Sequence, residues 1–193
     1  MRLPLRTPLD VASVPPEERR LAHARRQLAV RDPVTHGGYG PRPLGSELMR
    51  TVHGDVAKIL SDGLAAAPAG APPAVQQAIW AGNQLIGLPY VYGGGHGSFS
   101  SSGYDCSGTV SFALHGAALL SAPMDSAQFF AWGRPGNGRW VTVYTSAGHA
   151  FVEIAGIRLD TSTAGDPAGL SGPRWRPLLD ATSGYVARHP ADY

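Results

Sequence analysis

Residues 87–108 read GLPYVYGGGHGSFSSSGYDCSG and contain the only cysteine of the chain, Cys106. The cysteine follows a glycine- and serine-rich loop and stands between Asp105 and Ser107. Asp105 is a good N-cap residue, so we predict that a helix begins at Cys106. The unpaired N–H groups and the dipole at a helix N-terminus favour a thiolate over a thiol. The stretch therefore makes Cys106 a candidate nucleophile, although a lone cysteine is more often a small buried hydrophobic residue.

The spacing of apolar residues around this stretch predicts helices first and strands later. Apolar residues recur at intervals of three and four, which indicates helices over residues 46–62, 74–86 and 106–120. Ser46 is the expected N-cap of the first helix, and the run AAAPAGAPP (65–73) is expected to break the chain before the second. Alternation then predicts strands over residues 139–145, 149–154, 157–161 and 185–188. Helices followed by a meander of strands predict an α+β fold.

Length and composition fit one globular domain with an arm. The chain has 193 residues, of which 43% are hydrophobic, and no apolar run reaches the ~20 residues of a membrane-spanning helix. The N-terminal residues do not show the apolar segment of a signal peptide. We predict a basic, Pro- and Gly-rich arm or linker over residues 1–45, with a short helix possible over 16–30. One globular domain is predicted over residues 46–193.

Charge and cysteine content restrict the partners of the chain. The net charge is +2, but residues 1–50 carry nine arginines against five acidic residues. This arm could contact an anionic polymer or a membrane surface, and a solvated tail is the simpler interpretation. No nucleotide-binding fingerprint is present. We expect neither a nucleic-acid partner nor membrane contact. The oligomeric state stays open. A single cysteine forms no internal disulfide and no multi-cysteine zinc site, and neither a metal nor a cofactor is expected.

A cysteine nucleophile needs a base, and His149 is the favoured one of the seven histidines. A two-residue turn at 155–156 would put His149, Phe151 and Asp160 on one face of a hairpin, with His149 and Asp160 as diagonal neighbours ~7–8 Å apart at the backbone. An acid beside an imidazole orients the ring and stabilises its charged form. The alternative is a hydrogen-bonded surface pair without a catalytic role. His96, in the glycine-rich loop, could also line a site.

Four segments resemble the NlpC/P60 family of cell-wall cysteine peptidases. They are GLPYVYGG (87–94), DCSG (105–108), GHAFVEIAG (148–156) and LDTS (159–162). The resemblance implies that residues 46–193 are a catalytic domain with its core motifs within 74–162. The resemblance implies a compact papain-like fold, in which N-terminal helices and a nucleophile at a helix N-terminus pack on an antiparallel sheet. The loop between the GG and DC motifs is longer than is usual in the family, and it contains His96.

The resemblance also implies a role for each matched residue. Cys106 matches the nucleophile and His149 the general base. Asp160 stands where the family has a third residue, usually His, Asn or Gln, and an aspartate there favours the charged imidazole. Tyr90 matches a tyrosine whose hydroxyl faces the cysteine. Three residues match substrate-binding positions, of which the first two bind the free amine of a terminal L-alanine in some members: Asp105, Ser107 and Ser126.

The activity that this resemblance implies is hydrolysis of peptidoglycan stem peptides. The bond would join the γ-carboxyl of D-glutamate to a diamino acid, and the reaction would pass through a thioester acyl-enzyme. Such a protein is expected to be secreted or to act in the cell envelope. Two alternatives stay open. One is another acyl-transfer enzyme on the same scaffold (an amidase, a transglutaminase-like enzyme or an acyltransferase), and the other is a non-catalytic wall-binding domain.

Overall fold

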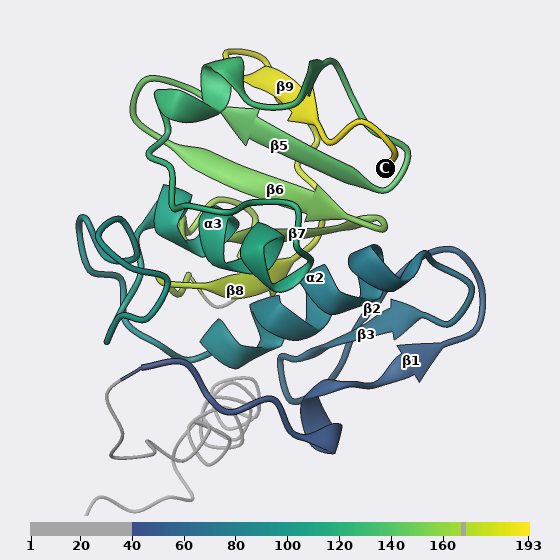
Figure 1. Cartoon of the computed structure of the whole chain (residues 1–193). Coiled ribbons are helices and arrows are strands. Elements are labelled where there is room, and N and C mark those ends of the chain that lie inside the picture. The colour runs from purple at the N-terminus through teal and green to yellow at the C-terminus, as the bar shows by residue number, and fades with distance from the viewer. Residues whose placement is uncertain (1–39, 167–168) are drawn as a thin grey trace, which may run out of the picture. The chain divides into compact units, whose positions relative to one another are not determined.

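The computed structural model describes residues 40–166 and 169–193, and its centre is a six-stranded sheet. Neighbouring strands are antiparallel throughout, in the order β4-β9-β5-β6-β7-β8 (Figure 1). The strands are β4 (Arg134–Pro135), β5 (Val141–Thr145), β6 (Ala150–Ile154), β7 (Ile157–Asp160), β8 (Arg174–Arg176) and β9 (Val186–His189). The four strands predicted from alternation are observed as β5, β6, β7 and β9, whereas β4 and β8 are too short to show a period.

The turn between β6 and β7 has the predicted length of two residues. Ala155 and Gly156 form it with φ values of 48° and 84°, and Ile154 pairs with Ile157 across it. Positive φ at both central positions is typical of tight hairpin turns. Because side chains alternate along a strand, this turn decides which face of the sheet each residue of β7 joins. The register predicted for the hairpin is therefore the observed one.

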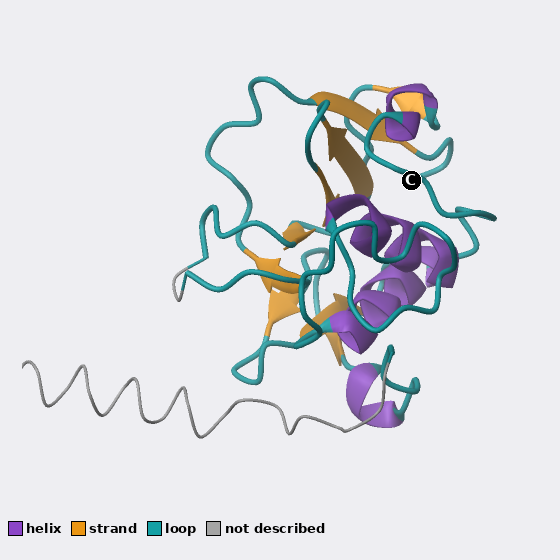
Figure 2. Ribbon diagram, turned by 90° about the vertical axis from the view of Figure 1, so that its left-hand side faces the viewer, coloured by secondary structure: helices purple, strands orange, loops and turns teal. Residues whose placement is uncertain are grey.

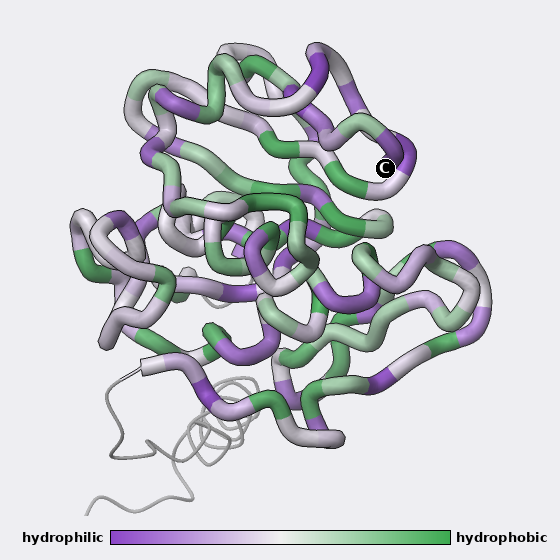
Figure 3. The backbone as a smooth tube through the Cα atoms, viewed as in Figure 1, coloured by the Kyte–Doolittle hydropathy of each residue, from purple (hydrophilic) through white to green (hydrophobic). Residues whose placement is uncertain are grey.

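Two α-helices, α2 (Pro73–Leu85) and α3 (Cys106–Gly116), cover one side of this sheet (Figure 2). α3 packs against β6 and β7, and α2 packs against α3. The hydrophobic colour in Figure 3 extends along much of β6, where α3 lies against it. The core between helices and sheet consists of fully buried side chains, among them Val75, Ile79, Val110, Leu114, Val152 and Leu159. The predicted α+β fold, with a helix that begins at Cys106 and packs on an antiparallel sheet, is confirmed.

The second and third predicted helices differ from the observed ones only at their ends. α2 begins one residue early, with prolines in its first turn, and stops before Gly87, which has a φ of 91°. α3 ends at Gly116 and not at residue 120. Ala118, with a φ of 57°, takes a left-handed conformation that the helix cannot continue through.

The helix predicted over residues 46–62 is wrong. This segment contains a single 3₁₀ turn, η2 (Ser46–Leu48), and two short strands, β1 (Thr51–Val52) and β2 (Lys58–Ile59). Gly45, and not Ser46, is the N-cap of that turn. Both strands pair with a third strand, β3 (Ala65–Pro68), β1 in parallel and β2 in antiparallel orientation. Pairing between segments distant in sequence has overridden the local helical spacing.

The strand β3 lies in the alanine-rich run that was expected to break the chain. All four of its residues are buried, and it forms the middle of this small sheet beside α2. Alanine side chains are small enough for a helix to approach the strand closely, but their sequence carries no alternation that would indicate a strand. The expectation of a break at residues 65–73 is therefore also wrong.

The arm predicted over residues 1–45 lies almost wholly outside the described residues, and so do the possible helix over 16–30 and two of the histidines. The boundary at residue 45 stays a prediction. In the part of the chain that the structure describes, we find no helix with the length and apolar character needed to cross a membrane.

A buried asparagine ties α2 to three other elements. Asn83 Oδ1 accepts hydrogen bonds from the Ala65 N–H and from Trp175 Nε1, both at 2.8 Å. Its Nδ2 donates to the carbonyl oxygens of Leu48 at 2.7 Å and Ala65 at 2.8 Å. The side-chain amide therefore uses both of its donors and both acceptor positions. One residue thereby connects α2 with η2, β3 and β8.

Replacing this amide by an apolar side chain of similar size is expected to weaken the fold. We expect Asn83→Leu to lower the free energy of unfolding by about 3 kcal/mol, because several buried partners lose their hydrogen bonds. Urea denaturation followed by circular dichroism measures the change. Gln77→Leu, at an exposed position of the same helix, is the control and is expected to stay within about 0.5 kcal/mol of wild type. An unchanged midpoint for Asn83→Leu would contradict the role assigned to the amide.

Candidate active site

The glycine-rich loop packs directly on the first turn of the helix that begins at Cys106. A Cβ atom at Gly108 would lie 2.0 Å from the carbonyl oxygen of Gly94, so neither the helix nor the loop leaves room for one. Gly93 and Gly95 have φ values of 74° and 87°, which glycine adopts without strain. The glycines thus serve the close contact between the loop and α3, and no phosphate site is needed to explain them.

Cys106 is the first residue of α3 and keeps 8% of its surface exposed. Asp105 caps the helix, and its Oδ1 accepts a hydrogen bond from the Gly108 N–H at 2.8 Å. The first N–H groups of a helix have no partner within it, and a helix N-terminus favours negative charge nearby. This is the position that the sequence predicted for the thiol.

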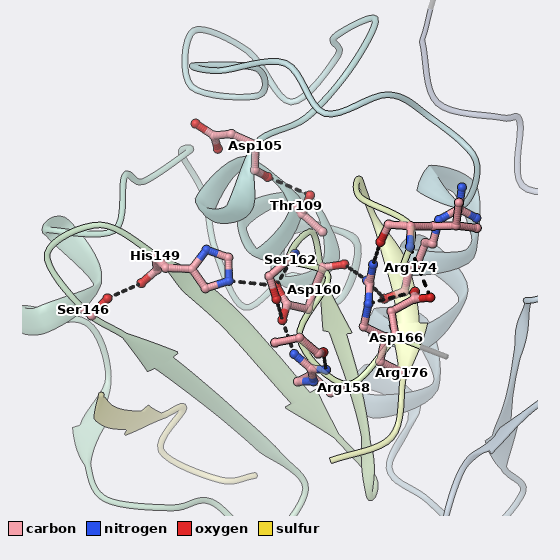
Figure 4. A network of polar contacts seen from close by, with 12 residues as sticks. Asp105, Thr109, Ser146, His149, Arg158, Asp160, Ser162, Asp166, Arg174 and Arg176 are labelled. Carbon is pink, nitrogen blue, oxygen red and sulfur yellow. Dashed lines mark hydrogen bonds and ion pairs between the residues drawn. The ribbon is translucent and has the colours of Figure 1, made fainter. Parts of the chain in front are cut away.

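His149 immediately precedes β6 and connects the thiol to an acid. Figure 4 shows its ring turned toward Asp160, and Nε2 lies 2.8 Å from Asp160 Oδ1. Cys106 also acts on the ring and raises its pKa, and Nδ1 is the ring nitrogen that Asp160 does not use. The three side chains of Cys106, His149 and Asp160 therefore come together from α3, β6 and β7.

The electrostatics of this group favour a charged imidazole. Burial lowers the pKa of His149, but the hydrogen bonds and charges of Asp160 and Cys106 outweigh burial and raise this pKa to about 9. Burial raises the pKa of Asp160, and hydrogen bonds from His149 and Ser162 outweigh it and lower that pKa to about 2. The protonated ring stabilises the fold fully below about pH 6.5, and this contribution is lost as the pH rises through about 9. The ionised carboxylate contributes above about pH 3.8, and its contribution is lost as the pH falls through about 2.

Donors surround the buried carboxylate of Asp160. The Ser162 N–H donates to Oδ1 at 3.0 Å, the Ser162 hydroxyl donates to Oδ2 at 2.7 Å, and Arg158 Nη1 also donates to Oδ2. Arg158 is itself fully buried and donates to the carbonyl oxygens of Pro177 and Ala164. Our sequence reasoning missed these supporting residues. The available signal was spacing, because Arg158 lies two residues before Asp160 on the same strand and therefore shares its face.

A second buried arginine fixes the backbone of the same segment. Arg176, on β8, donates to the carbonyl oxygen of Asp160 and, at 2.6 Å, to that of Leu170. It also forms an ion pair with Asp166 at 3.1 Å. The two arginines therefore hold the carboxylate and its backbone from two strands (Figure 4).

Tyr90 is 45% exposed, and the charge of Cys106 acts on its hydroxyl. Its backbone forms an isolated parallel β-bridge with that of Tyr104, the residue before the N-cap of α3. Burial raises the pKa of the Tyr90 hydroxyl, and the charges of Cys106 and Asp105 raise it further. The hydroxyl therefore stays protonated at neutral pH and can donate a hydrogen bond beside the thiol.

A second tyrosine, Tyr185, borders the site, although our sequence reasoning gave it no role there. Its ring lies edge-on to the His149 ring, with 6.4 Å between centroids, and edge-on to Phe151 at 5.0 Å. Burial raises the pKa of Tyr185, and the charges of Asp160 and Cys106 contribute. It comes from the segment just before β9, and no sequence signal linked that segment to the hairpin of β6 and β7.

The two residues that flank Cys106 form a polar cluster with His96. His96 Nε2 lies 2.9 Å from Asp105 Oδ2 and 2.9 Å from Ser107 Oγ. His96 therefore lies beside the predicted site residues Asp105 and Ser107.

Ser126 lies near the same end of the sheet as His149. Its carbonyl oxygen accepts a hydrogen bond from the Thr145 hydroxyl at the end of β5, and Thr145 pairs with Ala150, the residue after His149. The Ser126 hydroxyl makes no hydrogen bond with the described residues, and its role as a substrate-binding residue stays a prediction.

The assembled groups are those of acyl transfer by a cysteine. A thiol at a helix N-terminus, an imidazole in hydrogen-bonding reach and a buried carboxylate can form a nucleophile, a base and an orienting acid. Within residues 40–166 and 169–193, no group of three or more His, Cys, Asp or Glu side chains is arranged to hold a metal ion.

No family model matches the sequence, and a search of characterised proteins gives no match. Among solved structures, the peptidoglycan hydrolase RipB from Mycobacterium tuberculosis is similar over 97% of this chain and 92% of its own, with 21% identity and a TM-score of 0.46. A hypothetical invasion protein of M. tuberculosis is similar over 62% of this chain and 63% of its own, with 25% identity and a TM-score of 0.44.

A protein of the NlpC/P60 family from Bacillus cereus is similar over 62% of this chain and 41% of its own, with 19% identity and a TM-score of 0.45. The match to the invasion protein thus spans less than two thirds of that protein, and the match to the B. cereus protein less than half. The B. cereus protein belongs to the NlpC/P60 family, which is the family that the sequence motifs resemble.

The pKa of His149 can be measured directly. We expect the ring C–H resonance of His149 in an NMR titration to show a midpoint near pH 9, because Asp160 and Cys106 favour the charged ring. In Cys106→Ala the midpoint is expected to fall, since one hydrogen bond and one charge are removed, but to stay above 6.5 because Asp160 remains. His149→Gln identifies the resonance. A wild-type midpoint near 6.5 would show that the ring is not held as described.

Proposed function

We propose that this chain is a cysteine peptidase that hydrolyses peptidoglycan stem peptides between the γ-carboxyl of D-glutamate and a diamino acid. The observation that carries the proposal is the position of His149, whose pKa Cys106 raises while a buried carboxylate, Asp160, holds Nε2 of the ring. The substrate class comes from the motifs that resemble the NlpC/P60 family. Because peptidoglycan lies outside the cytoplasmic membrane, the proposal implies a secreted protein or one of the cell envelope.

In the first half of the proposed reaction, the Cys106 thiolate attacks the carbonyl carbon of the γ-D-glutamyl bond. A carbon–sulfur bond forms, and the carbonyl electrons move to the oxygen. The backbone N–H of Cys106 and the Tyr90 hydroxyl are suited to donate to this oxyanion. His149 then gives its proton from Nδ1 to the nitrogen of the leaving amine as the carbon–nitrogen bond breaks. The products are a thioester on Cys106 and the released diamino acid segment.

In the second half, His149 is neutral and acts as a base. It takes a proton from water, and the oxygen of that water attacks the thioester carbon. The tetrahedral intermediate collapses with loss of the Cys106 thiolate, which leaves a free γ-carboxylate on D-glutamate. The imidazolium and the thiolate are thereby restored. Asp160 acts by orienting the ring and stabilising its charged form, and it takes no proton itself.

Products formed from purified muropeptides test this proposal. We expect mass spectrometry to show cleavage after D-glutamate, and Cys106→Ala to lose at least about a thousandfold in rate because the nucleophile is removed. Thermal melting of the variant provides the control for folding.

Each alternative predicts a different result in the same assay. Cleavage only at the amide between the muramoyl group and L-alanine would indicate an amidase. Transfer of the acyl group to an added amine, without hydrolysis, would indicate a transferase. Full activity of Cys106→Ala would refute every mechanism that uses the thiol, and binding without turnover by the wild type would indicate a wall-binding domain.

The pKa of His149 sets an expected limit on activity at alkaline pH. The ring must carry a proton to release the amine, so kcat/KM is expected to fall as the pH rises through about 9. A thioester analogue of the substrate is the control, because its leaving thiolate needs no proton. The same alkaline decline for both substrates would assign it to another group.

A further inference from the structure

His96 covers the carboxylate that stands next to the proposed nucleophile. Its Nε2 lies 3.0 Å from Asp105 Oδ1, 2.9 Å from Asp105 Oδ2 and 2.9 Å from Ser107 Oγ. Asp105 and Ser107 are almost fully buried, with 3% and 2% of their surfaces exposed, whereas the His96 side chain is 34% exposed. The imidazole is therefore the outermost member of this polar cluster and the one that a ligand would meet.

The Asp105 carboxylate has no position left for a ligand cation. Its Oδ1 accepts hydrogen bonds from the Gly108 N–H at 2.8 Å and from the Ser107 hydroxyl at 3.3 Å. Its Oδ2 accepts from the Gly93 N–H at 3.0 Å. With His96 Nε2 added, the donors equal the roughly four lone-pair positions of a carboxylate. An ammonium group would have to displace the imidazole to reach it.

The exposed side of the His96 ring offers a different kind of contact. Nε2 faces Asp105 and Ser107, and Nδ1 has no partner among the described residues. An N–H at Nδ1 of the charged ring suits a carbonyl oxygen, and the charge of that ring repels an ammonium. The neutral ring can accept a hydrogen bond, but its width keeps a ligand cation out of direct contact with the carboxylate. In neither state does the cluster provide an ion pair for a free amine.

We propose that His96 determines specificity by making this site accept stem peptides whose N-terminal amine is acylated, as it is where L-alanine remains joined to muramic acid. The resemblance to other members implied that Asp105 and Ser107 bind a free terminal amine, and in this chain His96 takes that place. The inference rests on the proposed function for its substrate. It predicts that the enzyme cleaves stem peptides still attached to muramic acid, and not released peptides with a free N-terminal amine.

Two forms of one substrate test the inference. The tripeptide of L-alanine, γ-D-glutamate and a diamino acid is assayed with its amine free and with its amine acetylated. We expect wild type to cleave the acetylated form at least as efficiently as the free form, measured by kcat/KM. His96→Ala is expected to shift this ratio toward the free amine by about tenfold, as one charge-assisted hydrogen bond to Asp105 becomes available.

Two control variants separate recognition from general damage. His96→Gln keeps a side-chain N–H near the carboxylate and is expected to retain most of the wild-type ratio. His53→Ala, at an exposed position between β1 and β2, is expected to leave the ratio unchanged. A wild type that favours the free amine by tenfold, or an unchanged ratio in folded His96→Ala, would overturn the inference. If His96→Ala does not fold, the kcat/KM ratio of wild type for the acetylated and the free tripeptide tests the inference by itself.

A binding experiment distinguishes failure of this inference from failure of the proposed function. Calorimetry on Cys106→Ala measures the affinity for the dipeptide L-alanyl-γ-D-glutamate with its amine free and acetylated, and needs no turnover. If wild type cleaves neither tripeptide, the proposed function fails. Tighter binding of the free dipeptide would overturn the role of His96 whatever the enzyme cleaves, and equal or tighter binding of the acetylated one supports that role.

Discussion

The hydrogen bond between the buried Asp160 carboxylate and the His149 ring is the interaction on which the rest of the site depends. An unpaired carboxylate is very costly to bury, so its surroundings must supply donors. Arg158, which would itself be costly to bury alone, and Ser162 supply these donors, and the buried Arg176 donates to the backbone carbonyl oxygen of Asp160. The result is a fixed negative charge that orients the His149 ring and raises its pKa. Three residues that follow β6 in the chain hold this carboxylate or its backbone: Arg158, Ser162 and Arg176.

The thiol reaches the imidazole because two layers of the fold meet at one end. Cys106 is placed by the helix layer, where glycines let a loop press against the first turn of α3. His149 is placed by the sheet layer, at the start of the strand on which α3 packs. Neither layer alone contains a site. The hydrophobic contact between α3 and β6 therefore sets the distance on which the chemistry depends.

The parts of this structure that could be predicted from sequence are those governed by local rules. A capping aspartate marked the start of α3, and strand alternation with a short turn brought His149 to Asp160. The helix predicted over residues 46–62 failed because the partner of those strands is an alanine run with no period of its own. Arg158 and Arg176 were missed because a charged residue on a strand usually indicates a solvated position. The contacts of His96 depend on how a long loop closes, which no local spacing records.

The two-residue turn between β6 and β7 limits how this gene can change in length. Inserting or deleting one codon there would turn Asp160 to the opposite face of the sheet, although its place in the sequence would hardly alter. A change of two codons would preserve the parity and require only a different loop geometry. Two sequences that differ by one residue in this turn would therefore contain the same motifs, but only one of them would place Asp160 on the same face as His149. If a sequence alignment opens a one-residue gap in this turn, the residues of β7 that it aligns have side chains on opposite faces of the sheet.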